Sequence, residues 1–194
     1  MNRFGKVVLI VLCFTMLILS GCWSYVSKEA REKFETRDGA FSVTVYPVSV
    51  VIGQERVQDE QLAAEVINFL ARGKLAHPVM GIGNIDIPVK WGRNQAKMAQ
   101  RSAINFSDQM KEEEIQTDYA LLVEILCNSS ETNVGGVHYY LCDKEGNLAD
   151  GGLTNSHWDE FHKVEPHDRN GGLAVAKLML RKGWIISEND INAD

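Results

Sequence analysis

The chain of 194 residues has little cysteine and little proline, four of each, and it has no internal repeat. Basic side chains are also few, because 20 basic residues stand against 26 acidic ones, and this acidic balance argues against nucleic acid as a partner. The fractions of hydrophobic residues (45%) and charged residues (24%) are those of ordinary globular proteins, which excludes a disordered or fibrous chain. No apolar run reaches the about 20 residues that a membrane-spanning helix needs.

The first 22 residues carry the clearest pattern in the sequence. A basic start with Arg3 and Lys6 leads into an apolar run over residues 7–19, which ends in small residues before Cys22. This order is typical of a secretory signal peptide. The run of 13 residues is too short for a membrane-spanning helix. A signal peptide that is cut elsewhere, with Cys22 an ordinary thiol, remains as an alternative.

The four residues Leu19-Ser20-Gly21-Cys22 resemble the lipobox of bacterial lipoproteins. The resemblance implies cleavage before Cys22, a diacylglyceryl group on its sulfur and usually a further acyl chain on the new amino terminus. Two or three acyl chains make a stable membrane anchor. In Gram-negative lipoproteins an aspartate after the cysteine commonly causes retention in the inner membrane, so Trp23 implies the outer membrane, facing the periplasm. In a Gram-positive organism the same lipobox implies the outer face of the cytoplasmic membrane.

The 172 residues that follow Cys22 have a length that suits one domain. The leader contains two basic residues and no acidic ones, so the mature chain carries 18 basic and 26 acidic side chains and a net charge of −8. Anionic lipid head groups repel such a chain, so we expect the lipid rather than a basic patch to anchor it. Residues 23–40 are polar and lack a sustained period, which predicts a tether that lifts the domain off the membrane, with one helical turn around residues 29–34. We expect the domain at 41–184 and an acidic tail at 185–194.

Periodic patterns within the domain predict a layered α/β (α+β) fold. Tyr119–Cys127 is apolar on both faces and is predicted to be the central strand, and Gly146 supports a hairpin turn. Pro47 predicts that residues 48–52 form only an edge or bulged extension. We expect a mixed sheet of about five strands and three main helices, with part of one face or edge uncovered. The predicted strands are 41–46, 79–82, 119–127, 137–142 and 148–154, and the predicted helices are 59–72 (ending at Gly73), 94–113 and 172–182 (ending at Gly183).

Two cysteines, Cys127 and Cys142, lie outside the leader and the lipobox. In an oxidising compartment such a pair often forms a disulfide. A tight connection between the two predicted strands separates the cysteines by about 13 Å at 3.3 Å per residue. A disulfide requires Cα atoms within about 7 Å. Both interpretations, a disulfide and two buried free thiols, therefore remain open.

Glu124 is the charged residue of the predicted central strand. A buried carboxylate requires a partner or water. An ion pair, or a partly open sheet face, is the simpler interpretation, and a catalytic role is the alternative.

Three histidines and four carboxylates fall within residues 157–168, and these side chains are ligands for zinc and other divalent ions. The first candidate ligands are His157, Glu160 and His162. The histidines recur every five residues, which turns about 140° on an α-helix and changes face on a strand. Only an irregular loop brings them together, and a solvated polar loop is the alternative to a metal site. No other cofactor is expected.

Arg93, Lys97 and Arg101 recur every fourth residue along the predicted helix 94–113. This spacing places them on one side of the helix. Such a row either binds an anionic partner or is an ordinary solvated face.

Residues 117–125 (TDYALLVEI), a polar loop, residues 139–143 (YYLCD) and a glycine turn form a pattern similar to that of a group of envelope proteins. The group includes the N-terminal domain of TolB, the penicillin-binding-protein activator LpoB and the curli lipoprotein CsgG. The resemblance covers residues 118–154 and implies a periplasmic or outer-membrane α/β domain that binds other proteins. Its motifs are structural rather than catalytic.

Together these patterns predict a lipid-anchored cell-envelope lipoprotein, an accessory or assembly factor whose domain binds an envelope protein or peptidoglycan. The expected contact surface is an open sheet face or the loops at 128–136 and 155–170. A metal-dependent hydrolase that uses the histidines of residues 157–167 is one alternative, and a structural lipoprotein that assembles with itself is another. No Gly-x-Ser-x-Gly or His-Glu-x-x-His motif is present, so the sequence offers little evidence for an enzyme.

Overall fold

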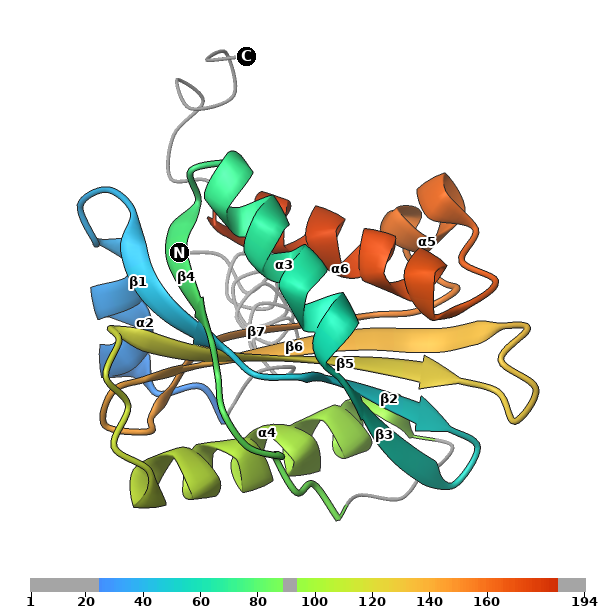
Figure 1. Ribbon diagram of the computed structural model, residues 1–194, viewed down its shortest axis with the longest axis horizontal. Coiled ribbons are helices and arrows are strands. Elements are labelled where there is room, and N and C mark those ends of the chain that lie inside the picture. Colours follow the sequence, from blue (N-terminus) through green and yellow to red (C-terminus); the bar gives the residue numbers. More distant parts are fainter. Residues whose placement is uncertain (1–24, 89–93, 185–194) are drawn as a thin grey trace, which may run out of the picture.

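A computed structural model describes residues 25–88 and 94–184, apart from the side chain of Glu160. The described chain forms three layers, in which α3, α5 and α6 cover one face of a mixed β-sheet and α4 covers the other (Figure 1). The predicted α/β fold is confirmed, with five helices and seven strands in the described part in place of about three and five. The leader, Cys22, Trp23 and the tail at 185–194 lie outside the described residues.

Helices and strands are mixed along the described chain rather than grouped by type. None of the helices described here has both the length and the apolar character that crossing a membrane requires. The helices are α2 (Lys28–Glu35), α3 (Glu60–Arg72), α4 (Gln95–Glu112), α5 (Asp159–Val164) and α6 (Arg169–Trp184). The strands are β1 (Phe41–Val45), β2 (Val48–Ile52), β3 (Glu55–Asp59), β4 (Ala76–Met80), β5 (Tyr119–Cys127), β6 (Val134–Asp143) and β7 (Leu148–Thr154).

The seven strands occupy only five positions across the sheet. β1 and β2 are two parts of one position, separated at Pro47, which has no N–H with which to continue the ladder. β1 pairs in parallel with the first part of β5, and β2 pairs in parallel with its second part. Beyond them lie β4, parallel to β1, and β3, antiparallel to β2. β6 and β7 continue the sheet on the other side of β5 as antiparallel strands.

Of the two forms predicted for residues 48–52, the edge strand is wrong and the bulged extension is confirmed. Val45 lies opposite Leu121 and Ser49 lies opposite Glu124, which leaves one extra residue on the β1–β2 side. β2 lies between β3 and β5, and the edge on that side is β3. The sequence of β3, ERVQD, is mostly polar and shows no buried apolar face, so its pattern does not indicate a strand. Its antiparallel pairing with β2 follows directly from the tight turn at Gly53, where the backbone adopts φ +61°.

β5 is the centre of the fold, as predicted, and all nine of its residues are buried. Its odd-numbered side chains join the core beneath α3 and α6, together with Val43 and Val45 of β1. Its even-numbered side chains face α4, where Ala120 and Leu122 pack with Phe106. The alternation of side chains along a strand therefore builds two cores from one segment.

The predicted long helices form where their capping residues indicate. The Asp59 side chain accepts a hydrogen bond from the Leu62 N–H (3.0 Å), and Asn94 caps α4 in the same way. The predicted left-handed stop at Gly73 is wrong, because Gly73 has φ −75° and Lys74 takes the positive φ of 51°. Gly183 is not a stop either, since α6 continues through it to Trp184.

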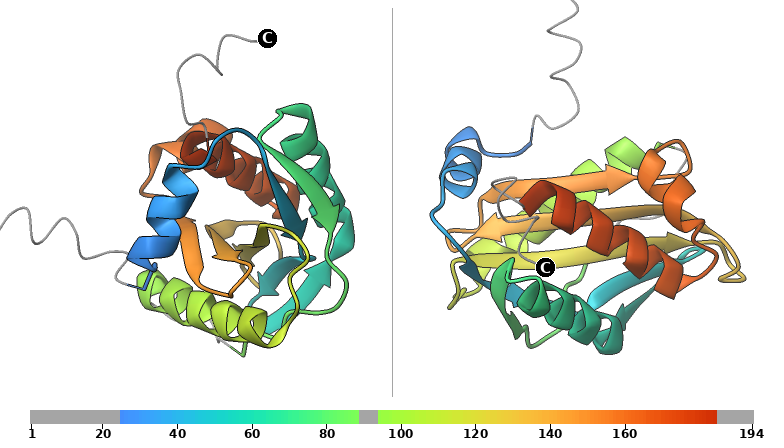
Figure 2. Two further views of the ribbon diagram at one scale, coloured as in Figure 1. Left: turned by 90° about the vertical axis from the view of Figure 1, so that its left-hand side faces the viewer. Right: turned by 90° about the horizontal axis from the view of Figure 1, so that it is seen from above.

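The predicted tether is also corrected, because residues 25–40 pack against the domain. Ser27 caps α2, and its N–H donates to the Leu148 carbonyl (2.9 Å). Phe34 is buried, and its ring meets those of Phe41, Tyr119 and Trp184 edge to face, with centroids 5.3–6.0 Å apart. Figure 2 shows the beginning of α2 beside α4. The folded body therefore begins by Tyr25, the third residue after Cys22.

Gly172 allows α6 to lie close to β5, so its replacement should destabilise the protein. A Cβ atom at this position lies 2.5 Å from Ile125 Cγ2. We expect Gly172→Ala to lower the free energy of unfolding by about 1–3 kcal/mol through overpacking, despite an intrinsic helix preference for Ala of about 1 kcal/mol. Urea denaturation measures the change, and a variant more stable than the wild type contradicts this close packing.

Candidate functional site

Six polar residues meet beneath α4, and we call them the Glu124 cluster. The strand register produces the cluster, because Glu124 of β5 lies directly opposite Ser49 of β2 on one side and His138 of β6 on the other. Neighbours in register on the same sheet face are within contact distance. The members are Ser49, Arg56, Ser102, Glu124, His138 and Tyr140.

The carboxylate of Glu124 accepts hydrogen bonds at both oxygens. Its Oε1 accepts from Arg56 Nη1 (2.6 Å) and Ser102 Oγ (3.4 Å). Its Oε2 accepts from His138 Nδ1 (2.8 Å) and the Tyr140 hydroxyl (3.0 Å). Because an ionised carboxylate only accepts, the proton between Glu124 and His138 is assigned to Nδ1. The other ring nitrogen, Nε2, is buried without a hydrogen-bond partner among the described residues.

The electrostatics of the cluster keep Glu124 ionised. Burial alone raises the pKa of this carboxyl group, but the hydrogen bond and charge of His138, followed by those of Arg56, outweigh burial and bring its pKa to about 2. Burial and the neighbouring carboxylate raise the pKa of Tyr140 well above its usual value. The ion-pair interpretation of Glu124 is thus confirmed by its 2.6 Å contact with Arg56.

The Glu124 cluster is closed to solvent, which limits what it does chemically. Ser102, Glu124, His138 and Tyr140 are all buried, and only Arg56 reaches the surface, with 15% of its side chain exposed. A substrate has no path to the carboxylate in this structure. What the arrangement does is link β2, β3, β5 and β6 to each other and to α4 through charged hydrogen bonds, each stronger than a neutral one.

The low pKa of Glu124 predicts that stability falls at acid pH. Its ordinary pKa of 4.5 drops to about 2 in the folded protein, so the stabilisation is complete above pH 4.5 and is lost as the pH falls from 4.5 toward 2. The shift corresponds to on the order of 3 kcal/mol. Urea denaturation at stepped pH measures it, and Glu124→Gln should lack this step. A wild-type curve that is flat between pH 4.5 and 2 contradicts the prediction.

The exposed side of α4 carries a row of residues that we call the basic stripe: Lys97, Arg101, Ile104, Asp108 and Lys111. Two members of the predicted basic row, Lys97 and Arg101, lie here on one side of the helix, whereas Arg93 lies outside the described residues. Asp108 pairs with Lys111 (2.9 Å). Three cations against one anion give the stripe a net charge of +2.

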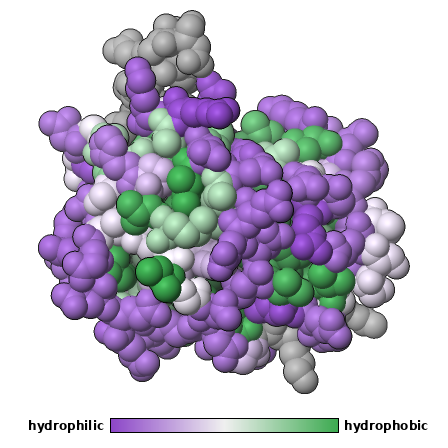
Figure 3. Space-filling view, viewed as in Figure 1, coloured by the Kyte–Doolittle hydropathy of each residue, from purple (hydrophilic) through white to green (hydrophobic). Residues whose placement is uncertain are grey.

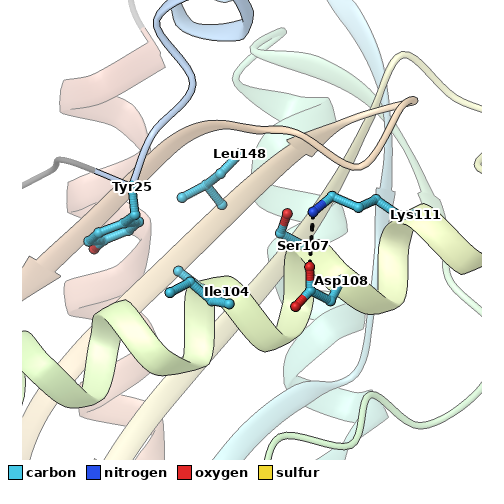
Figure 4. A pocket seen from close by; sticks show the side chains of 7 residues that line it. Tyr25, Ile104, Ser107, Asp108, Lys111 and Leu148 are labelled. Carbon is cyan, nitrogen blue, oxygen red and sulfur yellow. Dashed lines mark hydrogen bonds and ion pairs between the residues drawn. The ribbon is translucent and has the colours of Figure 1, made fainter.

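A small pocket lies between the basic stripe and the first described residue of the chain (Figure 4). Its volume of about 170 Å³ is below the roughly 300–1,000 Å³ of typical small-molecule sites. It is therefore smaller than a typical small-molecule site. The residues that line it are Tyr25, Ala103, Ile104, Ser107, Asp108, Lys111 and Leu148.

The histidine segment differs from the predicted irregular loop, because residues 159–164 form α5. His157 and His162 are exposed, and positions 160 and 162 are two apart on a helix, so they do not share a side. The side chain of Glu160 lies outside the described residues. Within residues 25–88 and 94–184, no group of three or more His, Cys, Asp or Glu side chains is placed to hold a metal ion.

Of the two alternatives for the cysteines, the structure contains the free thiols and the disulfide is wrong. Cys142 lies opposite Ala120 and faces α4, whereas Cys127 lies opposite Val134 and faces α6. Ala120 and Cys127 are seven residues apart along β5, a distance of more than about 20 Å. The loop over residues 128–133 is shorter than predicted, because β6 starts earlier, at Val134. Cys127 therefore lies opposite Val134 instead of near His138, which moves the two cysteines farther apart.

The two buried thiols should be unreactive in the folded protein. Burial raises the pKa of Cys127 to about 11 and that of Cys142 further still, so thiolate is scarce. We expect an aromatic disulfide reagent to modify neither thiol in native buffer and both in denaturant. Rapid modification of the native protein, or a mass two hydrogens lower without reductant, contradicts this expectation.

The fold and these sites define a mixed α/β domain with a closed ion-pair cluster on one side of its central strand and a basic helix surface above it. A scan of the chain against models of protein families finds no match. A search of curated proteins finds no match either.

Proposed function

We propose that the chain is a lipid-anchored lipoprotein of the bacterial cell envelope, and that its α/β domain acts by binding another envelope component. The lipobox at residues 19–22, placed after a basic start and an apolar run, carries this proposal. The resemblance to the TolB, LpoB and CsgG group, whose members bind other proteins, supports it. That resemblance lies in residues 118–154, the segment that contains β5, β6 and β7.

The surface that best fits a binding role is the edge of the sheet at β4. Val79, Met80 and Ile82 are exposed there, Ile82 to 95%, and Figure 3 shows apolar residues gathered where Figure 1 draws β4. Clustered apolar residues at a surface are typical of protein interfaces. Pro78 limits strand addition at this edge, so we propose that side chains rather than backbone groups make the contact. An apolar patch favours a protein partner over a carbohydrate polymer.

Cell fractionation tests the anchor. In bacteria that express the full chain, we expect the wild type in the membrane fraction, released by detergent but not by high salt, and Cys22→Ser in the soluble periplasmic or extracellular fraction. Salt is the control for charge-mediated attachment. A wild-type chain in the cytosol with its leader intact contradicts the proposal.

Photocrosslinking in intact cells tests the contact surface. A photoreactive amino acid at position 79 should give one discrete adduct with an envelope protein, and the same group at Leu178, an exposed residue of α6, should not. Adducts of the chain with itself favour the self-assembling alternative. Equal crosslinking from both positions contradicts a binding surface at β4.

A further inference from the structure

The folded body begins very close to the proposed lipid anchor. Cys22 and Tyr25 are three residues apart, and a fully extended chain covers at most about 3.6 Å per residue. The lipidated cysteine therefore lies within about 11 Å of Tyr25. A body tied this closely does not rotate freely above its membrane, so the surface around Tyr25 is the surface held nearest to the lipid.

That surface belongs to α4. Tyr25 shares one pocket with Ile104, Ser107 and Lys111, as Figure 4 shows. The pocket adjoins the C-terminal half of the basic stripe, from Ile104 to Lys111. α4 lies on the opposite side of the sheet from α3 and α6 (Figure 1). The proposed anchor and the stripe thus lie on the same side of the molecule.

The charge of this surface opposes that of the rest of the protein. The basic stripe carries +2, whereas the mature chain carries −8, so the remainder carries −10. Lys97 and Arg101 contribute cations without an ion pair in the described structure, and Ile104, 46% exposed, lies between the charged residues. Glu112, the exposed last residue of α4, adjoins Lys111 at the C-terminal end of the stripe. Glu113 follows it and accepts a hydrogen bond from Tyr46 (2.5 Å) on the sheet side.

We propose that the basic stripe of α4 lies against the bilayer and binds anionic phospholipid head groups. The proposal rests on the lipid anchor of the proposed function. The cations of the basic stripe are attracted to an anionic membrane surface. The aliphatic side chain of Ile104, which lies between them, enters the membrane interface, and the acidic remainder of the domain faces away from the membrane. Lipid and basic stripe then act together as two signals that fix one orientation.

Lipid-borne quenchers report this orientation. The full chain is isolated from membranes, its lipidated Cys22 is verified by mass, and it is reconstituted in nanodiscs that contain head-group nitroxide quenchers. A fluorophore is attached through Ile104→Cys or, as a matched control, through Leu178→Cys, since both residues are exposed aliphatics on helices of opposite layers. The native thiols are buried and do not compete for the label.

We expect severalfold stronger quenching at position 104 than at position 178 in discs that contain phosphatidylglycerol, and a smaller difference in discs of phosphatidylcholine alone. Each cation near the surface favours docking by about fivefold, so Lys97→Gln with Arg101→Gln should lower the ratio of docked to free orientations by about 25-fold. Equal quenching at the two positions, or stronger quenching at 178, overturns the proposal. If the mass of the purified chain shows no lipid on Cys22, this result refutes the lipid anchor of the proposed function. It differs from equal quenching at the two positions, which refutes the proposed orientation of α4.

Discussion

Replacing Glu124 with glutamine should lower the free energy of unfolding by about 3–5 kcal/mol, which is the usual cost of removing one partner of a buried ion pair. The substitution keeps the size of the side chain but leaves the Arg56 guanidinium without its counter-charge. It also turns an amide N–H, a donor, toward the donors of His138 and Tyr140, which now bond the carboxylate. Urea denaturation of the purified protein measures the loss.

A matched control separates burial from charge. Glu65→Gln removes the partly exposed ion pair with Lys177 (3.0 Å) and should cost no more than about 1 kcal/mol. If Glu124→Gln does not fold, Arg56→Met tests the same pair from the other side, and the double variant should be less destabilised than the two single losses combined. Equal effects of Glu124→Gln and Glu65→Gln contradict the Glu124 cluster as a structural centre.

Replacing Phe34 with alanine should lower the free energy of unfolding by about 3–5 kcal/mol, the range for removing a buried aromatic ring. The ring is buried among Phe41, Tyr119 and Trp184, and the Arg37 guanidinium lies 3.7 Å from its centroid. Removal leaves a cavity at the point where the N-terminal segment joins the sheet. Thermal or urea unfolding measures this loss of stability directly.

The control for Phe34 lies on the same helix. Glu32 is exposed, and its ion pair in the described part of the chain is with Lys28 (3.7 Å), so Glu32→Ala should change stability by less than about 0.5 kcal/mol. If residues 25–40 were a tether, both substitutions would leave stability unchanged. A negligible effect of Phe34→Ala therefore contradicts the packed α2 and, with it, the short distance between anchor and body.

Elements with strong periodicity could be predicted from the sequence, and those defined by tertiary contact could not. α3, α4 and β5 have sustained apolar patterns and capping residues, and the structure contains them. β3 and α5 are short and polar. β3 forms because β2 provides partners for its backbone, and α5 is held in place by the buried ring of Phe161. α2 has only Ala30 and Phe34 as buried residues, which is too little apolar periodicity to distinguish a packed helix from a tether.

The Glu124 cluster could be predicted only in part. A carboxylate in an apolar strand indicates a buried partner, and Glu124 has one. The identities of Arg56 and His138 depend on strand register, which a sequence pattern does not fix across 68 and 14 positions. The sequence pattern of residues 137–142 does not indicate that α4 covers the side of the strand that carries His138.

The mass of the N-terminal peptide of the protein purified from bacterial membranes tests the central claim most directly. We predict that the peptide begins at Cys22 and carries the added mass of a diacylglyceryl group, with or without a third acyl chain. A peptide that begins at Met1, or a Cys22 without lipid, would contradict the membrane location and with it the proposed role of α4 at the bilayer.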